Sequence, residues 1–146
     1  MIERFTRFSL SIAEINRHWH RLAAEEMEKF GLKGSHALYL TTLYHYSRGL
    51  SSVKLSELCG KDKADVSRMI SILIEKGFVY RAELEDQQYR RPLLLTDKGK
   101  AAACQVLERI QMAVEKAGSG LDETHRKVFY ESLEQISENL RRLSLQ

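Results

Sequence analysis

An apolar stripe runs through the N-terminal part of the chain, with charged and polar residues between its members. Its spacing averages roughly 3.5 residues, the heptad-like spacing of a helix that packs along another helix. We expect one long helix that ends near Phe30, because Gly31 and Gly34 follow. The apolar positions of this stripe are Ile2, Phe5, Phe8, Ile12, Ile15, Trp19 and Leu22.

The C-terminal part of the chain shows the same pattern in its last helix. Thr96 is a suitable N-cap for a long helix over residues 97–117, and residues 118–120 then form a turn. A final helix is expected over residues 122–143. Its heptad-like stripe consists of Phe129, Leu133, Ile136, Leu140 and Leu143.

Glycines and polar turns divide the central part of the chain into shorter elements. Ser35 is a plausible cap for the first of three helices, and Gly77 ends the third. A hairpin follows, so the order is that of a winged helix-turn-helix, and we predict a mainly α fold with a small β-hairpin wing. The helices are expected over residues 35–46, 54–59 and 63–76, and the hairpin over 78–84 and 91–95 with a polar tip at 85–90.

The two terminal stripes have no obvious partner within the chain for all of their apolar surface. A stripe that stayed exposed would promote aggregation. We expect the terminal helices of two copies to interlock around a two-fold axis; the alternative is that both helices pack on their own domain. The predicted dimer residues are Ile2, Phe5, Phe8, Ile12, Phe129, Leu133, Ile136, Leu140 and Leu143.

The helix over residues 63–76 has two unlike faces. Val66, Ile70 and Leu73 fall together at about 100° per residue and form its packing face. The opposite face is small and polar around Arg68, a surface that can approach the base edges of DNA, although an ordinary solvated face has the same composition. The residues predicted to contact DNA are Lys61, Lys63, Ala64, Ser67, Arg68 and Ser71, with the two lysines on phosphates.

Other charges in this region have structural or backbone-binding interpretations. Asp62 and Asp65 have the spacing that satisfies free amides at a helix start, so we assign them as cap and first-turn charges. In the wing, Pro92 marks a strand start or edge because it has no amide to donate. Asp86 is expected to hold an arginine in place. The wing arginines predicted to contact DNA are Arg81, Arg90 and Arg91, and the last two lie at or just past the tip, where they can clamp phosphate or enter the minor groove.

The overall composition says less about function than the positions of the charged residues do. The net charge of +3 is a weak argument for nucleic acid. No apolar run approaches the ~20 residues that span a bilayer, and the N-terminus lacks a signal-peptide core. Cys59 and Cys104 lie far apart in the sequence and form no metal or redox motif. We expect a cytoplasmic protein, nucleoid-associated when bound to DNA, with no membrane partner.

Several segments resemble the MarR family of bacterial transcription regulators. The resemblance covers nearly the whole chain and implies a homodimer that binds a palindromic operator, usually represses, and is often released by a small ligand or oxidant. We expect a DNA-binding lobe over residues 34–100 and a helical dimerisation region over residues 1–33 and 101–146, together one continuous structural unit. Asp86 is followed by glutamines, a departure that leaves open which wing arginine enters the groove. The matching segments are 55–58, 65–70, 73–79 and 90–100.

Three kinds of signal are compatible with the sequence. A small aromatic or anionic effector could bind near the junction of the first two helices. Thiol sensing would use Cys59 or Cys104, although free cysteines are most often inert. Metal sensing is disfavoured because His18 and His20 point in different directions on a helix. The predicted effector pocket residues are Trp19, His20, His36 and Tyr39.

The sequence contains no recognisable catalytic motif. It has no phosphate-binding glycine loop, no Ser-His-Asp-like set in a known context and no carboxylate pair in a candidate cleft. We expect a non-enzyme without a cofactor. The alternative to a DNA-binding regulator is a winged helix that binds another protein through its Arg68 face, without reading DNA.

Overall fold

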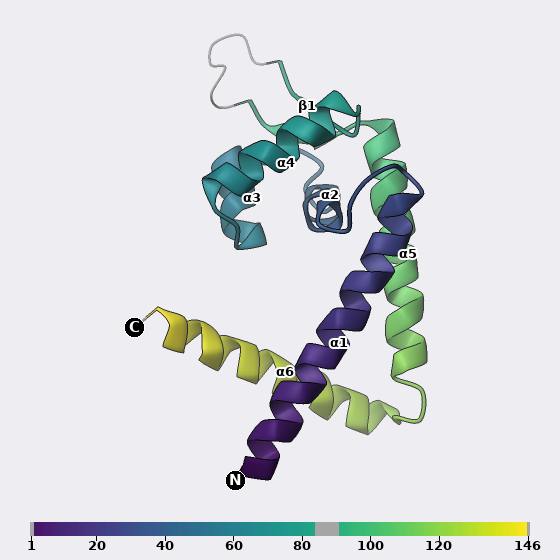
Figure 1. Ribbon diagram of the computed structural model, residues 1–146, viewed down its shortest axis with the longest axis vertical. Helices are drawn as coiled ribbons and strands as arrows, with labels where there is room; N and C mark the ends of the chain where they lie inside the picture. The colour runs from purple at the N-terminus through teal and green to yellow at the C-terminus, as the bar shows by residue number, and fades with distance from the viewer. Residues whose placement is uncertain (1, 84–90, 146) are drawn as a thin grey trace. The chain divides into compact units, whose positions relative to one another are not determined.

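The computed structural model describes residues 2–83 and 91–145, which form six helices and two short strands (Figure 1). The predicted wing tip lies outside the described residues. By packing, the chain divides into residues 1–110 and residues 111–146, with helix α5 contributing to both units. The elements are α1 (Ile2–Glu28), α2 (His36–Tyr44), α3 (Ser52–Cys59), α4 (Lys63–Glu75), β1 (Val79–Arg81), β2 (Leu93–Leu95), α5 (Asp97–Ala117) and α6 (Glu123–Ser144). The predicted class, mainly helical with a small antiparallel hairpin, is confirmed.

A side-chain cap explains where helix α3 begins, but not where α2 begins. Helix α3 begins before its predicted start because the Ser51 side chain accepts a hydrogen bond from the Lys54 amide. Ser35 lies at the predicted N-cap position of α2, but its side chain does not make the hydrogen bond expected of a cap. The Lys33 amide instead donates to His36 Nδ1 at 3.0 Å, which orients the first residue of the helix.

The turn between α3 and α4 is built from backbone and side-chain caps. Gly60 has a φ of 63°, a left-handed conformation that glycine adopts without strain, and it ends α3. The Lys61 amide then donates to the Ser56 carbonyl at 3.2 Å. Asp62 begins α4, with its Oδ1 atom accepting the Asp65 amide at 2.7 Å, which confirms its predicted role as a cap.

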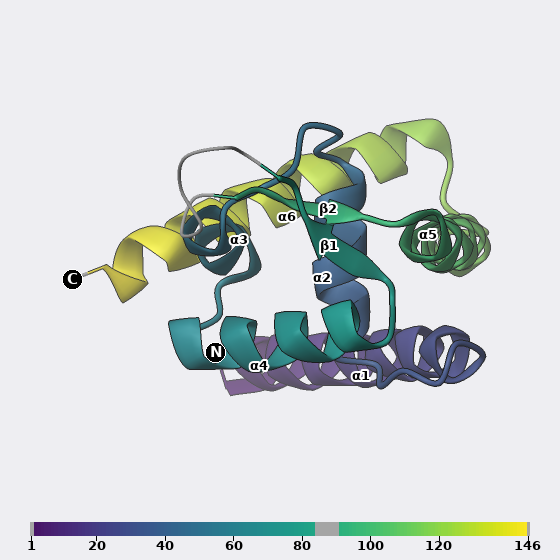
Figure 2. The same cartoon turned by 90° about the horizontal axis from the view of Figure 1, so that it is seen from above.

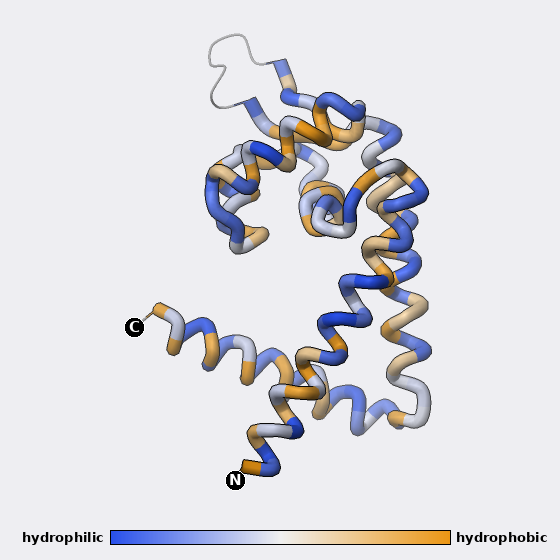
Figure 3. Tube along the Cα trace, viewed as in Figure 1, coloured by the Kyte–Doolittle hydropathy of each residue, from blue (hydrophilic) through white to orange (hydrophobic). Residues whose placement is uncertain are grey.

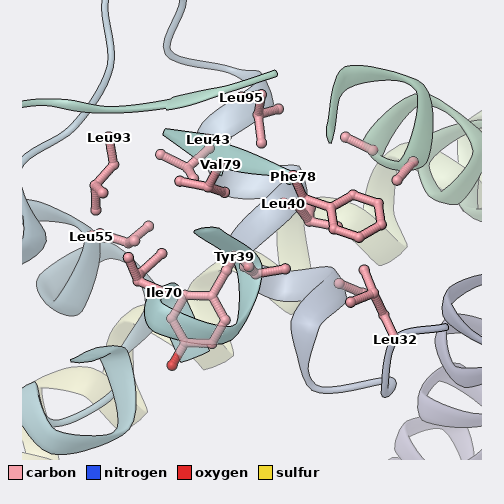
Figure 4. Close-up of a cluster of buried hydrophobic side chains, with 14 of the residues drawn as sticks. Leu32, Tyr39, Leu40, Leu43, Leu55, Ile70, Phe78, Val79, Leu93 and Leu95 are labelled. Atoms are coloured by element: carbon pink, nitrogen blue, oxygen red, sulfur yellow. The ribbon is translucent and has the colours of Figure 1, made fainter. Parts of the chain in front are cut away.

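Helix α2 lies at the centre of the core of residues 1–110. It contacts α1, α3, α4 and β2, and Figure 2 shows it beneath the two strands. Leu40 and Leu43 of α2 meet Leu55 of α3 and Leu93 of β2 in one apolar cluster (Figure 4). Because α2 is covered on several sides, its sequence is apolar without a strongly polar face.

The hairpin is shorter than the extended runs in the sequence suggest. Strand β1 pairs antiparallel with β2, from Val79 opposite Leu95 to Arg81 opposite Leu93. Pro92 cannot donate to the ladder, and its carbonyl accepts only the Ala82 amide, at 2.9 Å, before the described ladder ends. A bridge between Leu50 and Leu93 adds a further strand contact at the other edge.

The terminal apolar stripes are exposed among the described residues. In α1, Ile2 is 85% and Phe5 is 72% exposed, and almost every residue up to His18 is exposed. No residue of α6 is buried. Apolar and polar positions follow one another along both helices (Figure 3). None of the described helices is both long and apolar enough to cross a membrane.

Candidate nucleic-acid interface

Helix α4 has a buried face and a solvent face, as its sequence predicts. Val66, Ile70 and Leu73 are buried in the core. The predicted DNA-contacting residues are exposed on or beside the opposite face, and the Arg68 side chain is 72% exposed. Besides Arg68 they are Lys61, Lys63, Ala64, Ser67 and Ser71. Since the side chains around Arg68 are short, this face can approach a flat or grooved partner closely.

The start of α4 is electropositive. Lys61 and Lys63 are exposed on either side of the cap, where the free amides of the first turn give the helix its positive end. The Asp62 side chain accepts a hydrogen bond from one of those amides. The other free amides and the two lysine ammonium groups can bind anionic oxygens. This end of the helix can therefore hold phosphate while the middle of the helix faces bases.

Asp65 is tied to the core rather than acting only as a first-turn charge. The hydroxyl of Tyr39, a buried residue of α2, donates to Asp65 Oδ2 at 2.5 Å. Arg68 donates to the other carboxylate oxygen at 3.4 Å. The hydrogen bond from Tyr39 is the main reason that the pKa of Asp65 is lowered, while burial and this carboxylate raise the pKa of Tyr39. Asp65 is thus held as a carboxylate beside Arg68.

The structure places two of the three predicted wing arginines. Arg81 is exposed on β1 and donates to the Ser52 hydroxyl at 3.4 Å, which joins the hairpin to the start of α3. Arg91 is half-buried just before β2. Arg90 and Asp86 lie outside the described residues, so the choice between Arg90 and Arg91 stays a prediction.

A cavity of about 530 Å³ lies behind the N-terminal half of α4. Three predicted pocket residues, Trp19, His20 and Tyr39, line it together. His36 does not; it is only 3% exposed, with its ring held by the Lys33 amide. Apolar side chains from α1, α2, α4 and α5 form much of the remaining wall. Such a cavity suits a small ligand with an aromatic body and few polar groups.

No protein-family model matches the chain, but solved structures match most of its length. The transcriptional regulator SlyA superposes with a TM-score of 0.80 at 25% identity, over 91% of this chain and 93% of SlyA. A putative MarR family regulator from Listeria monocytogenes, solved with 26mer DNA, gives 0.78 at 20% identity, over 89% and 86% of the two chains. The chain has the winged-helix fold of the MarR family. Staphylococcus aureus MepR, solved as a DNA complex, matches with a TM-score of 0.78 at 20% identity, over 91% and 96% of the chains.

Two thiols lie within this MarR-family fold, and both are half-buried. Burial raises the pKa of the Cys59 thiol, which also contacts the Thr42 hydroxyl at 3.6 Å. Cys104 lies 3.1 Å from the hydroxyl of Tyr44. A raised pKa leaves less thiolate at neutral pH, so Cys59 has the environment of an unreactive thiol rather than of an oxidant sensor.

Sequence reasoning missed part of the cavity wall of the MarR-family fold. Lys61, Asp65 and Met69 line the cavity as well as belonging to the turn and helix that carry the solvent face. Asp65 and Met69 are four residues apart on α4 and so share a helix face, which is the available signal, whereas Lys61 lies in the turn before the helix. The Tyr39–Asp65 hydrogen bond joins positions distant in the sequence, and neither residue alone indicates it.

Proposed function

We propose that this chain is a sequence-specific regulator of transcription that binds double-stranded DNA through α4 and the wing. The exposed face of α4 is the observation that carries this proposal. It combines short polar side chains, one protruding guanidinium and two lysines at the positive end of the helix. Two structures of similar fold were solved with DNA, which supports the same use of this fold here.

The proposed assembly is a homodimer on a palindromic operator, and the proposed effect is repression. The exposed apolar residues of α1 and α6 supply a surface that a second copy can cover. A dimer presents two recognition helices, so half-sites about one helical turn apart would be bound together. The resemblance to the MarR family supports repression rather than activation.

A small aromatic or anionic molecule is the proposed effector, bound in the cavity beside Trp19. Benzoate, an aromatic carboxylate, is a suitable first probe. The chain has one tryptophan, so a saturable change in its fluorescence would report binding at this wall. We expect benzoate to lower operator affinity over the same concentration range. Binding without any effect on DNA would separate the cavity from regulation.

Selection of genomic fragments by the purified protein at two salt concentrations tests the DNA-binding proposal. We expect enrichment of a palindrome, with affinity that falls steeply as salt rises because phosphate contacts release counterions. A salt-insensitive interaction with another protein, without enrichment of any DNA sequence, would favour the protein-binding alternative.

Arg68→Ala then tests the placement of the recognition helix. We expect a loss of ~1–3 kcal/mol in operator binding and weaker discrimination against changed base pairs. Lys100→Ala is the control, because it removes an equal charge from an exposed position on α5. Operator affinity equal to wild type in the Arg68 variant would show that α4 does not read the bases through this residue.

A further inference from the structure

A chain of side-chain hydrogen bonds joins the buried helix α2 to the exposed face of α4. Tyr39, which is 1% exposed, donates its hydroxyl to Asp65 Oδ2 at 2.5 Å. Arg68 donates to Oδ1 of the same carboxylate at 3.4 Å. In Figure 4 the Tyr39 hydroxyl points away from the apolar cluster around its ring. The carboxylate therefore has one oxygen on the core side and one on the solvent side.

We propose that Tyr39 is a positioning residue for DNA readout, which fixes the Asp65 carboxylate so that Asp65 in turn aims the Arg68 guanidinium. This inference rests on the proposed function, because it concerns how Arg68 meets a base pair. Tyr39 itself does not contact DNA in this proposal; it acts through Asp65.

An Asp–Arg pair exposed on one helix would not by itself fix a guanidinium. Such pairs are weak in water, because both side chains must give up freedom to meet. Here the carboxylate is already ordered: Tyr39 holds one oxygen, and the Asp65 amide is bound by the Asp62 side chain. Arg68 then pairs with a group that has little freedom left to lose. A preorganised guanidinium loses less entropy when it meets the base edge.

The electrostatics agree with this geometry. The hydrogen bond from Tyr39 lowers the pKa of Asp65, with a smaller contribution from Arg68, so the carboxylate stays charged near neutral pH. Burial keeps the Tyr39 hydroxyl protonated and raises its pKa, which leaves it a permanent donor. The order of donors around Asp65 is therefore fixed under conditions in which DNA binds.

The test compares base discrimination between matched variants. The operator and a set of half-site variants, each changed at one base pair, are titrated by fluorescence anisotropy at fixed salt. Tyr39→Phe removes only the hydroxyl, and Arg68→Ala identifies the base pair that Arg68 reads. Tyr44→Phe is the matched control. It also removes a hydroxyl from α2, but that hydroxyl is hydrogen-bonded to Cys104 and not to a residue of α4.

We expect Tyr39→Phe to reduce discrimination at the Arg68 base pair by about three- to tenfold while affinity for non-specific DNA stays unchanged. In the Arg68→Ala background the same change should have no further effect, because Tyr39 acts through Arg68. Tyr44→Phe should discriminate like wild type. Asp65→Asn, which keeps the size of the side chain, should lose discrimination at the same base pair and serves if Tyr39→Phe does not fold.

Two results would overturn this proposal while leaving the proposed DNA readout by α4 intact. Discrimination equal to wild type in folded Tyr39→Phe or Asp65→Asn would show that the hydrogen bond only satisfies a buried hydroxyl. An equal loss from Tyr39→Phe with and without Arg68 would show a general effect on the helix. If Arg68→Ala itself leaves discrimination unchanged, or no operator is found, the proposed readout by α4 fails together with this inference.

Discussion

Gly99, in the first turn of α5, allows this helix to touch the backbone that follows α4. A Cβ atom at this position would lie 2.0 Å from the Phe78 carbonyl oxygen and 3.2 Å from Leu95 Cδ2. The same carbonyl accepts the Thr96 amide at 3.0 Å, and Thr96 Oγ1 accepts the Gly99 amide at 3.0 Å. Relief of the clash therefore has to move backbone that carries the cap of α5.

Gly99→Ala is expected to destabilise the protein although alanine is the better helix former. The clash should cost about 3 kcal/mol, at the upper end for overpacking because the neighbour is backbone. Better helix propensity offsets about 0.5–1 kcal/mol of this. The net loss, about 2 kcal/mol, corresponds to a melting temperature lower by about 4–8 °C for a chain of this size.

Thermal unfolding followed by circular dichroism measures this effect, at equal protein concentration because an oligomer melts in a concentration-dependent way. Gly118→Ala is the matched control. Its Cβ would meet the end of the Arg126 side chain at 3.3 Å and the Val114 carbonyl at the same distance, where a small adjustment suffices. A Gly99→Ala protein as stable as wild type, or more stable, would refute the close approach of α5 to Phe78.

Three other predictions follow from particular side chains. Burial lowers the pKa of His36, so the unfolded chain binds a proton there more readily and stability should fall as pH drops below about 6.5. Urea titrations at pH 7 and pH 5.5 should show a weaker pH dependence of stability for His36→Asn than for wild type. An unchanged pH dependence would contradict this role of His36. Burial raises the pKa of Cys59, so iodoacetamide should alkylate it more slowly at pH 7 than it alkylates free cysteine, as mass spectrometry would show; a faster reaction would revive thiol sensing. Leu140→Lys, at an exposed position of α6, should shift the protein toward monomers in sedimentation experiments, whereas Glu134→Lys should not; a stable dimer in the Leu140 variant would move the interface elsewhere.

Patterns that depend on neighbours along the chain were predictable from the sequence. The buried face of α4 follows from residues three and four apart, and the Asp62 cap from a polar residue placed before them. Thr96 was predicted to cap α5, and its hydroxyl oxygen accepts the Gly99 amide. In each case the deciding contact spans only a few residues, so local spacing contains the information.

Contacts between distant segments were not predictable in the same way. Ser35 is a residue type that commonly caps helices, but its side chain makes no cap hydrogen bond. The hydrogen bond from the Lys33 amide to His36 stabilises the turn before α2 instead. The Leu50–Leu93 bridge and the Tyr39–Asp65 hydrogen bond each join segments that only the tertiary fold brings together. His36 was predicted to line the effector pocket because it lies near the other pocket residues in the sequence. It is buried and does not line the cavity.

The central position of α2 has a consequence for local opening of the protein. A helix of 9 residues is too short to be stable in isolation, so α2 depends on the elements that surround it. Its backbone amides can meet solvent only when those elements separate, and their hydrogen exchange should report global unfolding. In a single copy of the chain, amides in the first turns of α1 have no such cover and should exchange through fraying. The hydrogen-exchange rate of the Leu40 amide would therefore report the free energy of unfolding of the core of residues 1–110.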